Sequence, residues 1–323
     1  MGERRRLQDV GAVYLVSNVT NEGQAFMTPC DAVNSIIRNN LAWAADRRRV
    51  ELFAYNFNPD AFAMIVAAPC LNLGRFMGDF QGLTAREINA HHGRTGRFFE
   101  GRYQSTRLLD DGAIIEALGR VLCGPCEFGL VANPDDWKGV SSLELHRNGE
   151  ALVGQREDRA LYRDLLRANP DMTEAEARRL ATTTHTVELA KLSPWRDKTH
   201  MAYHRTVCAT AADHALEIDT DRPRPNLGMS EVANLPMTHW LGRRWRREPL
   251  CRASYPSGER PFRKRFADLN LKYENAAAAL RRNRKRLDFP HGMIPPHIMR
   301  AVGSTRTLPR GPVRPGSTAN HAA

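Results

Sequence analysis

Apolar and polar positions in the first part of the chain recur with the periods of strands and helices. A short apolar run at residues 12–17 (AVYLVS) is typical of a strand. Apolar residues at helical spacing follow Asp31 and end at the basic triplet 47–49, where cations suit the negative end of a helix dipole. Residues 50–57 and 62–68 are apolar segments joined by Asn58-Pro59-Asp60. This pattern predicts two strands in a hairpin.

The same reading continues to residue 143. Residues 71–91 predict a second helix, and alternation from Phe99 to Leu109 predicts another strand. Asp110 and Asp111 are candidate caps of a third helix, which we expect Pro125 to end. Gly129 and the run 133–136 (NPDD) are typical of turns. The resulting order of elements predicts an α+β fold, with an antiparallel four-stranded sheet and helices on one face.

The remainder of the chain divides by composition. Residues 144–230 are charged and helical in tendency, with surface helices expected at 156–167 and 172–180, the second capped by Thr173, and a linker at 219–225. A further helix is expected over 262–289. We therefore predict a first domain at 1–143, a helical, basic accessory region at 144–300, and a tail at 301–323. The tail is rich in Pro, Gly, Ser and Arg without acidic residues, which predicts disorder.

Charge narrows the class of partner. The 323 residues hold 47 lysines and arginines against 36 acidic residues, a net charge of +11. This excess favours a polyanion, either nucleic acid or an anionic membrane face, although a basic protein without such a partner is also consistent with it. No apolar run approaches the roughly 18 residues of a membrane span, so we expect no membrane association. Six scattered cysteines and an N-terminus without an apolar segment favour the reducing cytoplasm.

The segment from His92 to Trp137 carries the most specific signal. It opens with Arg94, Arg97 and Arg102 set among glycines and aromatic residues, and continues into the predicted third helix. An arginine-rich strand that leads into a helix is one pattern of a nucleic-acid surface. A solvated basic edge strand explains the same residues equally well on physical grounds.

Three motifs here carry a family resemblance. RFFEGRYQST (97–106), RVLCGPCEFGLV (120–131) and NPDDWKGVSS (133–142) resemble the REP-associated tyrosine transposases, single-tyrosine relatives of the HUH transposases. The resemblance covers about residues 11 to 143, and a weaker match at 260–292 is similar to the tail of long members. It implies a ferredoxin-like core, hairpin or single-stranded DNA as substrate, and a divalent metal (Mg or Mn) held by two histidines. It also implies a nucleophilic tyrosine and a possible homodimer.

The chain departs from this family at four positions. Ala61 and Ala63 stand where the resemblance places the two histidines, and alanine offers no ligand atom. Arg120 stands in place of the tyrosine, and Gly124 in place of an asparagine that precedes Pro125. We therefore expect no catalytic residue, no bound metal and no cofactor, and interpret these as degenerate site positions.

DNA contact is expected instead from basic and aromatic side chains, which neutralise phosphates or stack on bases. Arg120 also has a simpler interpretation, as a cation at the C-terminal end of its helix. The basic clusters of the last third could also be solvated helix faces, but the resemblance favours DNA contact for them. The candidates are Arg94, Arg97, Arg102, Arg107, Arg120, Arg243, Arg244, Trp245, Arg281, Arg282, Arg284 and Lys285.

Two further motifs point to other chemistry and are disfavoured. Cys123-Gly124-Pro125-Cys126 spells a thioredoxin-type motif, but it falls at the end of a predicted helix, where the dipole does not stabilise a thiolate. His200, His204 and Cys208 recur at four-residue spacing and could share a zinc ion, yet an amphipathic helix with packed imidazoles accounts for them more simply.

These observations favour a transposase-family DNA-binding protein that has lost catalysis. Two alternatives remain. One is an active transposase or nickase that uses Tyr103 or Tyr55, with a metal held by Asp60 or Glu100. The other is a protein–protein adaptor that kept the fold and lost DNA binding. We leave the DNA sequence, the oligomeric state and the role of residues 144–230 open.

Overall fold

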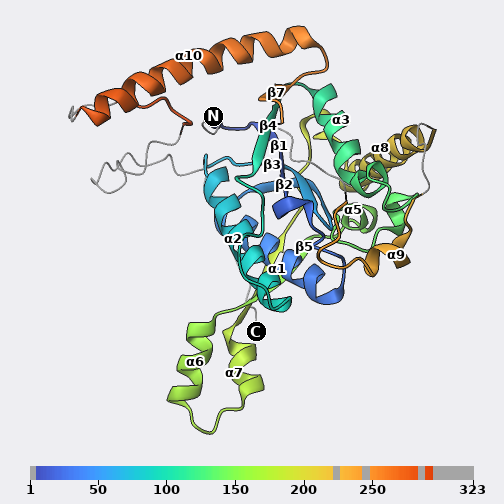
Figure 1. Cartoon of the computed structure of the whole chain (residues 1–323), viewed down its shortest axis with the longest axis vertical. Coiled ribbons are helices and arrows are strands. Elements are labelled where there is room, and N and C mark those ends of the chain that lie inside the picture. Colours follow the sequence, from blue (N-terminus) through green and yellow to red (C-terminus); the bar gives the residue numbers. More distant parts are fainter. Residues whose placement is uncertain (1–4, 221–225, 242–247, 283–287, 294–323) are drawn as a thin grey trace, which may run out of the picture.

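A computed structural model describes residues 5–220, 226–241, 248–282 and 288–293 (Figure 1). Its main sheet has the strand order β2-β3-β1-β4-β7. The antiparallel part comprises β1 (Val13–Val19), β2 (Glu51–Asn58), β3 (Ala61–Ala67) and β4 (Gln104–Leu108). A short strand, β7 (Cys251–Arg252), pairs parallel to β4. The α+β class is confirmed, but the sheet is mixed and five-stranded, so a strictly antiparallel four-stranded sheet is not what forms.

Helices cover both faces of this sheet, and the expectation of helices on one face is wrong. Helices α1 (Asp31–Arg48) and α2 (Leu73–His91) pack on one face, against the side chains of alternate residues such as Tyr14 and Val16. Helices α3 (Asp111–Leu122) and α8 (His200–Thr220) cover the other face. Both faces are buried because β3 (AFAMIVA) is apolar on each side, as in strands sandwiched between layers.

The early elements lie close to their predicted positions. The helix at Asp31 ends where Arg49 adopts the left-handed conformation (φ 52°), and its cap N–H bonds the carbonyls of Ala45 and Asp46. The hairpin turn at Asn58–Asp60 is present between β2 and β3. The carbonyl of Asp60 accepts the backbone N–H of Thr20, and the carbonyl of Pro59 accepts that of Met27. Both donors lie in the segment that follows β1.

The strand predicted from Phe99 to Leu109 is shorter than expected. Regular pairing begins only at Gln104, and the preceding residues form a loop. This loop bonds the end of β1 irregularly, through a bridge between Phe99 and Thr20 and through the N–H of Glu100, which donates to the Val19 carbonyl. Phe98 and Phe99 turn into the core, where their rings pack against Phe26 and Phe62. Both rings enter the same core cluster, whereas successive side chains of a regular strand point to opposite faces of the sheet.

The segment after β4 also differs in one detail. Asp110 caps α3 as predicted, because its side chain accepts the N–H of Ala113. Helix α3 ends at Leu122, however, and Pro125 lies in the first turn of a short helix α4 (Gly124–Glu127). Proline fits a first helical turn because its missing N–H is not needed there. Pro125 therefore opens a helix rather than ending one.

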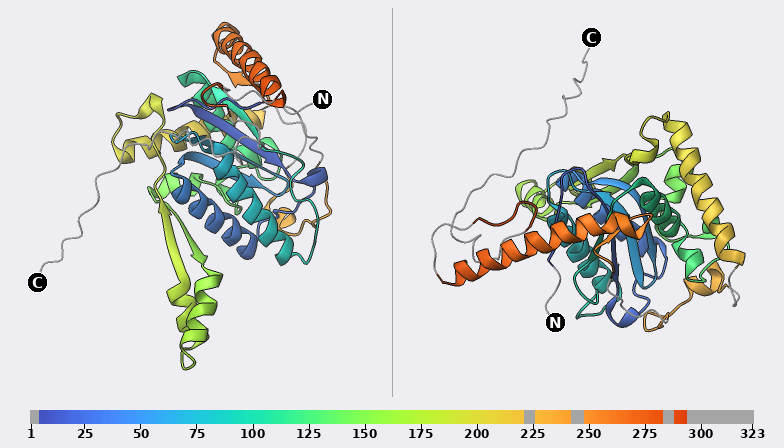
Figure 2. Two further views of the ribbon diagram at one scale, coloured as in Figure 1. Left: turned by 90° about the vertical axis from the view of Figure 1, so that its left-hand side faces the viewer. Right: turned by 90° about the horizontal axis from the view of Figure 1, so that it is seen from above.

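Residues after 142 add to the same core and form an arm. Helix α5 (Leu143–Asn148) and α8 pack with α3 in one apolar cluster. Strands β5 (Leu152–Glu157) and β6 (Thr182–Val187) pair with each other and lie on α1. The ribbon approaches α1 closely at Gly154, where an added Cβ would lie 2.7 Å from Ala42 Cβ. Beyond this ribbon, α6 (Arg159–Ala168) and α7 (Glu174–Ala181) project away from the body (Figure 2).

The surface helices predicted at 156–167 and 172–180 correspond to α6 and α7, with Thr173 capping α7 through the N–H of Glu176. Toward the C-terminus lie α9 (Met229–Ala233) and the long α10 (Pro256–Arg281). The remaining short 3-10 helices are Asn21–Gly23, Pro134–Asp136 and Ser193–Trp195. The division at residue 143 stays a prediction. None of the helices in the described ranges combines the length and apolarity that crossing a membrane requires.

Several predictions fall outside the described residues. They include most of the linker at 219–225, the cluster of Arg243, Arg244 and Trp245, the pair Arg284 and Lys285, and the tail at 301–323.

Candidate nucleic-acid interface

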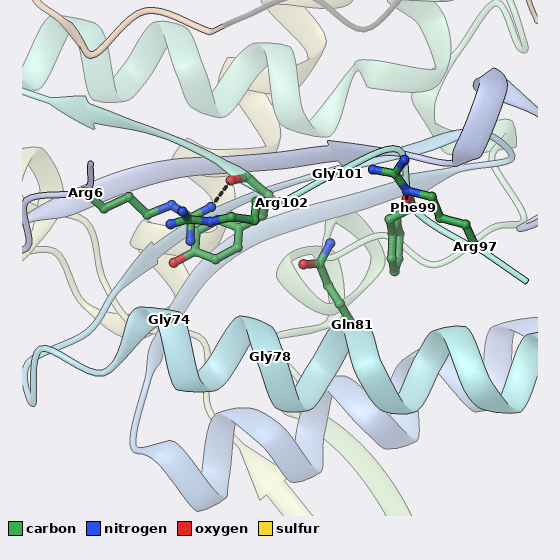
Figure 3. Close-up of a pocket in the computed structure, with 9 residues that line it drawn as sticks. Arg6, Gly74, Gly78, Gln81, Arg97, Phe99, Gly101 and Arg102 are labelled. Atoms are coloured by element: carbon green, nitrogen blue, oxygen red, sulfur yellow. Dashed lines mark hydrogen bonds between the residues drawn. The ribbon is translucent and has the colours of Figure 1, made fainter. Parts of the chain in front are cut away.

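An open pocket of about 500 Å³ lies between α2 and the loop that leads into β4 (Figure 3). Three arginines line it: Arg97 and Arg102 from this loop, and Arg6 from the N-terminal segment. None of the described lining residues is acidic. Arg97 and Arg102, both predicted for DNA contact, therefore line the same pocket, and Arg6 joins them from the N-terminal segment.

Glycines on α2 form the floor of this pocket. Gly74 and Gly78 are one helical turn apart and both line it. An added Cβ at Gly78 would meet no atom within 4 Å, so the space above this turn is open. Between the arginines, Gln81 rises from the same helix, as Figure 3 shows. The Gln81 Nε2 atom is buried without a hydrogen-bond partner among the described residues.

The arginines are held by the loop itself. Arg6 donates to the carbonyl of Tyr103, and its guanidinium stacks on the Tyr103 ring at 3.4 Å from the centroid. Arg97 Nε donates to the carbonyl of Phe99 at 2.9 Å. A guanidinium has five N–H donors, so Arg97 keeps donors for an oxyanion after this bond. Burial raises the pKa of the Tyr103 phenol, opposed by the charges of Arg6 and Arg102.

The two other arginines predicted in this region do not line the pocket. Arg94 stacks on Phe26 at 3.8 Å and donates to the carbonyl of Arg97 at 3.1 Å, so it supports the loop. Arg107 lies on β4, opposite Tyr14, with its guanidinium 5.6 Å from that ring. Both guanidinium groups therefore contact aromatic rings of the protein beside the pocket instead of lining it.

The four positions interpreted as degenerate lie elsewhere. Ala61 and Ala63 pair with Asn58 and Asn56 across the β2–β3 hairpin. Opposite residues of an antiparallel pair share a face, and here it is the face that α3 and α4 cover. An added Cβ at Gly124 would lie 3.0 Å from Asn56 Nδ2 and 3.6 Å from Asn58 Nδ2. Ala61, Ala63 and Gly124 therefore surround one pair of asparagines.

Arg120, the fourth of these positions, is paired with acidic side chains at the end of α3. It lies 3.6 Å from Glu116 and 3.5 Å from Glu127, both on its own side of the sheet. Its charge is therefore partly compensated at the end of α3, as the helix-cap interpretation expects. The arginine pocket is on the α2 face of the sheet, and Gly124 is on the face that α3 and α4 cover. The predicted DNA-binding arginines 97 and 102 and the degenerate site positions are therefore on opposite sides of the sheet.

The divalent metal that the resemblance implies does not fit the residues present. Ala61 and Ala63 have no ligand atoms, and the neighbouring asparagines bond each other, with Asn56 Nδ2 donating to Asn58 Oδ1 at 2.9 Å. Asn56 Oδ1 is buried and has no hydrogen-bond partner in the described parts of the chain. Throughout those parts, no three His, Cys, Asp or Glu side chains are grouped as metal ligands.

The alternative nucleophiles are enclosed. Tyr55 is 1% exposed and lies in the core on the α1 and α2 face, where burial raises the pKa of its phenol. Tyr103 is 5% exposed beneath Arg6. Asp60 is fully buried, and Glu100 accepts the N–H of Glu22 at 3.0 Å. Neither tyrosine is therefore placed to attack DNA from the surface, and Asp60, one of the two candidate metal ligands, is buried as well.

The thiol and imidazole motifs are packing features. Cys123 Sγ donates to the carbonyl of Ala211 at 3.0 Å, and burial raises the pKa of this thiol to about 12. A thiol held protonated is a poor nucleophile. His204 Nδ1 lies 3.0 Å from His146 Nδ1, and burial lowers the pKa of His146 to about 4. His204 is thus partnered by another histidine inside the α5–α8 contact.

The sequence interpretation missed Arg6, Gln81 and the asparagine pair. Gly74, Gly78 and Gly82 do recur at four-residue spacing within a predicted helix, which is a signal for an exposed helix face without side chains. Nothing in the local sequence marks Arg6 as a neighbour of residues 97 and 102.

Comparison with known proteins finds no matching family model and no matching curated protein. Among solved structures, the chain is similar to one titled as a REP-associated tyrosine transposase bound to a REP hairpin, at 13% identity and a TM-score of 0.38. That match covers 46% of this chain and 86% of the other. A putative transposase from Deinococcus radiodurans R1 matches at 19% identity and a TM-score of 0.26, over 32% of this chain and 84% of the other. Likeness at this level carries no argument about the site.

Proposed function

We propose that this protein binds DNA, as a hairpin or a single strand, through the pocket formed by Arg6, Arg97 and Arg102. The observation that carries the proposal is that three arginines line one pocket in which none of the described lining residues is acidic. Arginines spaced along one pocket favour an anionic chain whose successive phosphates can each reach a guanidinium group. Planar guanidinium groups are suited to phosphate oxygens, which they can bind in pairs.

The composition of the pocket favours a nucleotide chain over an isolated acidic side chain. The glycine floor leaves room above α2 for more than a single carboxylate, and several arginines are available to successive phosphates. The surplus of 47 basic over 36 acidic residues extends this preference over the whole molecule. Phosphates would bind the arginines, and the nucleotide chain would lie over the glycines of α2.

We also propose that DNA is bound without being cut. This part depends on the resemblance to the transposases, which assigns Ala61 and Ala63 to metal-binding positions and Arg120 to the nucleophile. The buried phenols of Tyr55 and Tyr103 offer no substitute. On this proposal the chain is a transposase-type DNA-binding protein with a degenerate catalytic centre, in which binding and former cleavage residues are on opposite faces of the sheet.

The test is a fluorescence anisotropy titration with a labelled DNA hairpin at two salt concentrations. Replacing Arg97 and Arg102 together by Gln should weaken binding to all sequences alike and reduce the salt slope by about one unit per lost phosphate contact. Arg75→Gln with Arg86→Gln is the matched control, because it removes the same charge from exposed positions of α2 outside the pocket. Equal losses in the two pairs would refute a specific role for the pocket.

Incubation of the hairpin with Mg²⁺ or Mn²⁺ tests the second part. We expect neither cleavage products nor a covalent protein–DNA adduct on a denaturing gel. An adduct would favour the alternative of an active nickase. Absence of any DNA binding by the unaltered protein would favour the adaptor interpretation.

A further inference from the structure

The N-terminal segment at residues 5–9, here called the strap, runs between α10 and the body of the protein. Its odd positions contact α10. Arg5 Nη1 donates to Asn270 Oδ1 at 2.7 Å and to Glu274 Oε1 at 2.8 Å. Asp9 accepts two bonds from the guanidinium of Arg265, at 2.6 and 3.0 Å. Between them, Leu7 is buried in an apolar cluster that also contains Phe262 of α10.

The even positions of the strap contact the pocket and its floor. Arg6 donates to the Tyr103 carbonyl and stacks on the Tyr103 ring. Gln8 Oε1 accepts the N–H of Leu73 at 3.0 Å, at the start of the helix that carries Gly74 and Gly78. In an extended chain, successive side chains point in opposite directions. Anchoring Arg5 and Asp9 on α10 therefore directs Arg6 and Gln8 toward the pocket.

Further bonds fix the strap along its length. The backbone N–H of Gln8 donates to the Gly292 carbonyl at 2.9 Å, and Leu7 forms a bridge with Met293. Tyr14 accepts the N–H of Asp9 and donates to the carbonyl of Leu7. Most of these partners lie in the last part of the described chain. The C-terminal segments thus hold an N-terminal arginine in place.

We infer that α10 positions Arg6 for phosphate binding through the strap, without itself contacting that phosphate. The inference rests on the proposed function, and it concerns how one arginine of the pocket is held in position. An arginine on a loose terminus loses conformational entropy when it binds, and this loss weakens affinity for the phosphate. A strap that is already fixed loses that entropy during folding, so binding is not weakened by it. The Arg265 guanidinium is bound to Asp9 by two bonds, so its part in DNA binding is indirect.

Two substitutions on α10 separate this role from a simple charge effect. Arg265→Gln releases Asp9 of the strap, whereas Arg263→Gln removes the same charge from a residue whose guanidinium bonds Glu259 within α10. We expect Arg265→Gln to weaken hairpin binding by about tenfold, as loss of one charge-assisted contact would, and Arg263→Gln to weaken it much less. Equal effects would overturn the inference in favour of non-specific charge.

A double-mutant cycle and a charge swap test the route through Arg6. If α10 acts through Arg6, adding Arg265→Gln to Arg6→Gln should cost little more than Arg6→Gln alone. The swap of Asp9→Arg with Arg265→Asp keeps the net charge and the ion pair, and should bind better than Arg265→Asp alone. Additive losses in the cycle, or a swap no better than the single variant, would overturn the inference.

Limited trypsin digestion tests the strap without DNA. Cleavage after Arg5 and Arg6, followed by mass spectrometry of the intact protein, should be faster in Arg265→Gln than in Arg263→Gln. Faster cleavage without any DNA binding by the unaltered protein would leave the strap intact as a structural finding and refute the proposed function. Unchanged cleavage together with normal DNA binding would refute the positioning role alone.

Discussion

Filling the pocket from its floor should separate DNA binding from stability. Gly78 lies inside α2, and an added Cβ there meets nothing within 4 Å. Gly78→Ala should therefore stabilise the fold by about 0.5–1 kcal/mol, because alanine loses less backbone freedom on folding than glycine does. Gly78→Leu should keep most of this gain, and its side chain would occupy part of the roughly 500 Å³ that the proposal assigns to DNA.

Chemical denaturation measures the first effect and anisotropy with the DNA hairpin the second. Gly82→Leu is the control, since Gly82 is on the same helix, also has open space around its Cβ position, and does not line the pocket. We expect Gly78→Leu to bind DNA at least about tenfold more weakly, equivalent to about 1.4 kcal/mol, and Gly82→Leu to bind normally. A stable Gly78→Leu variant with unchanged affinity would refute the assignment of the pocket.

Three further predictions concern the face of the sheet that α3 and α4 cover, and the buried His146 beside it. Gly124→Asn should destabilise the protein by about 1–3 kcal/mol in urea denaturation, because its Cβ would lie 3.0 Å from Asn56 Nδ2, and combination with Asn56→Ala should recover part of the loss. Ala61→His with Ala63→His should create a divalent-metal site detectable by calorimetry, because residues two apart on a strand share a face; no heat of binding above that of the unaltered protein would contradict this. The pKa of His146 is lowered to about 4 by burial, so the unfolded chain binds a proton that the folded one does not below about pH 6.5. The free energy of unfolding should therefore fall by up to about 3 kcal/mol as pH drops from 6.5 to 4, and a His146→Gln variant that keeps the same pH slope would show that another group is responsible.

Much of the local structure was predictable because its causes are local. The cap at Asp110, the cap at Thr173 and the hairpin turn before Ala61 depend on residues within a few positions of each other. Such bonds leave a readable pattern of residue types. The same holds for α1, whose apolar spacing and basic end were both visible in the sequence.

The burial of the second face of the sheet was not predictable, although the sequence contained a hint of it. Strand β3 is apolar at every position from Ala61 to Ala67, which is typical of a strand covered on both sides. The helix that provides the cover with α3 is α8, which follows a long charged region and packs through Tyr203, Val207 and Ala211. Their four-residue spacing predicts a helix with one buried side, but which surface that side covers depends on long-range packing, which local spacing does not encode.

The candidate site shows the same division. The sequence by itself determined that the protein is basic, that Arg97 and Arg102 lie in a glycine-bearing segment, and that Ala61 and Ala63 cannot hold a metal. Only the tertiary structure decided that Arg97 and Arg102 share a pocket with Arg6, and that Gly124 lies across the sheet from it. The physical reason is that the segment around Arg6 is bonded to α10 through Arg5 and Asp9, and no pattern within either of these segments, which are distant in sequence, encodes their meeting.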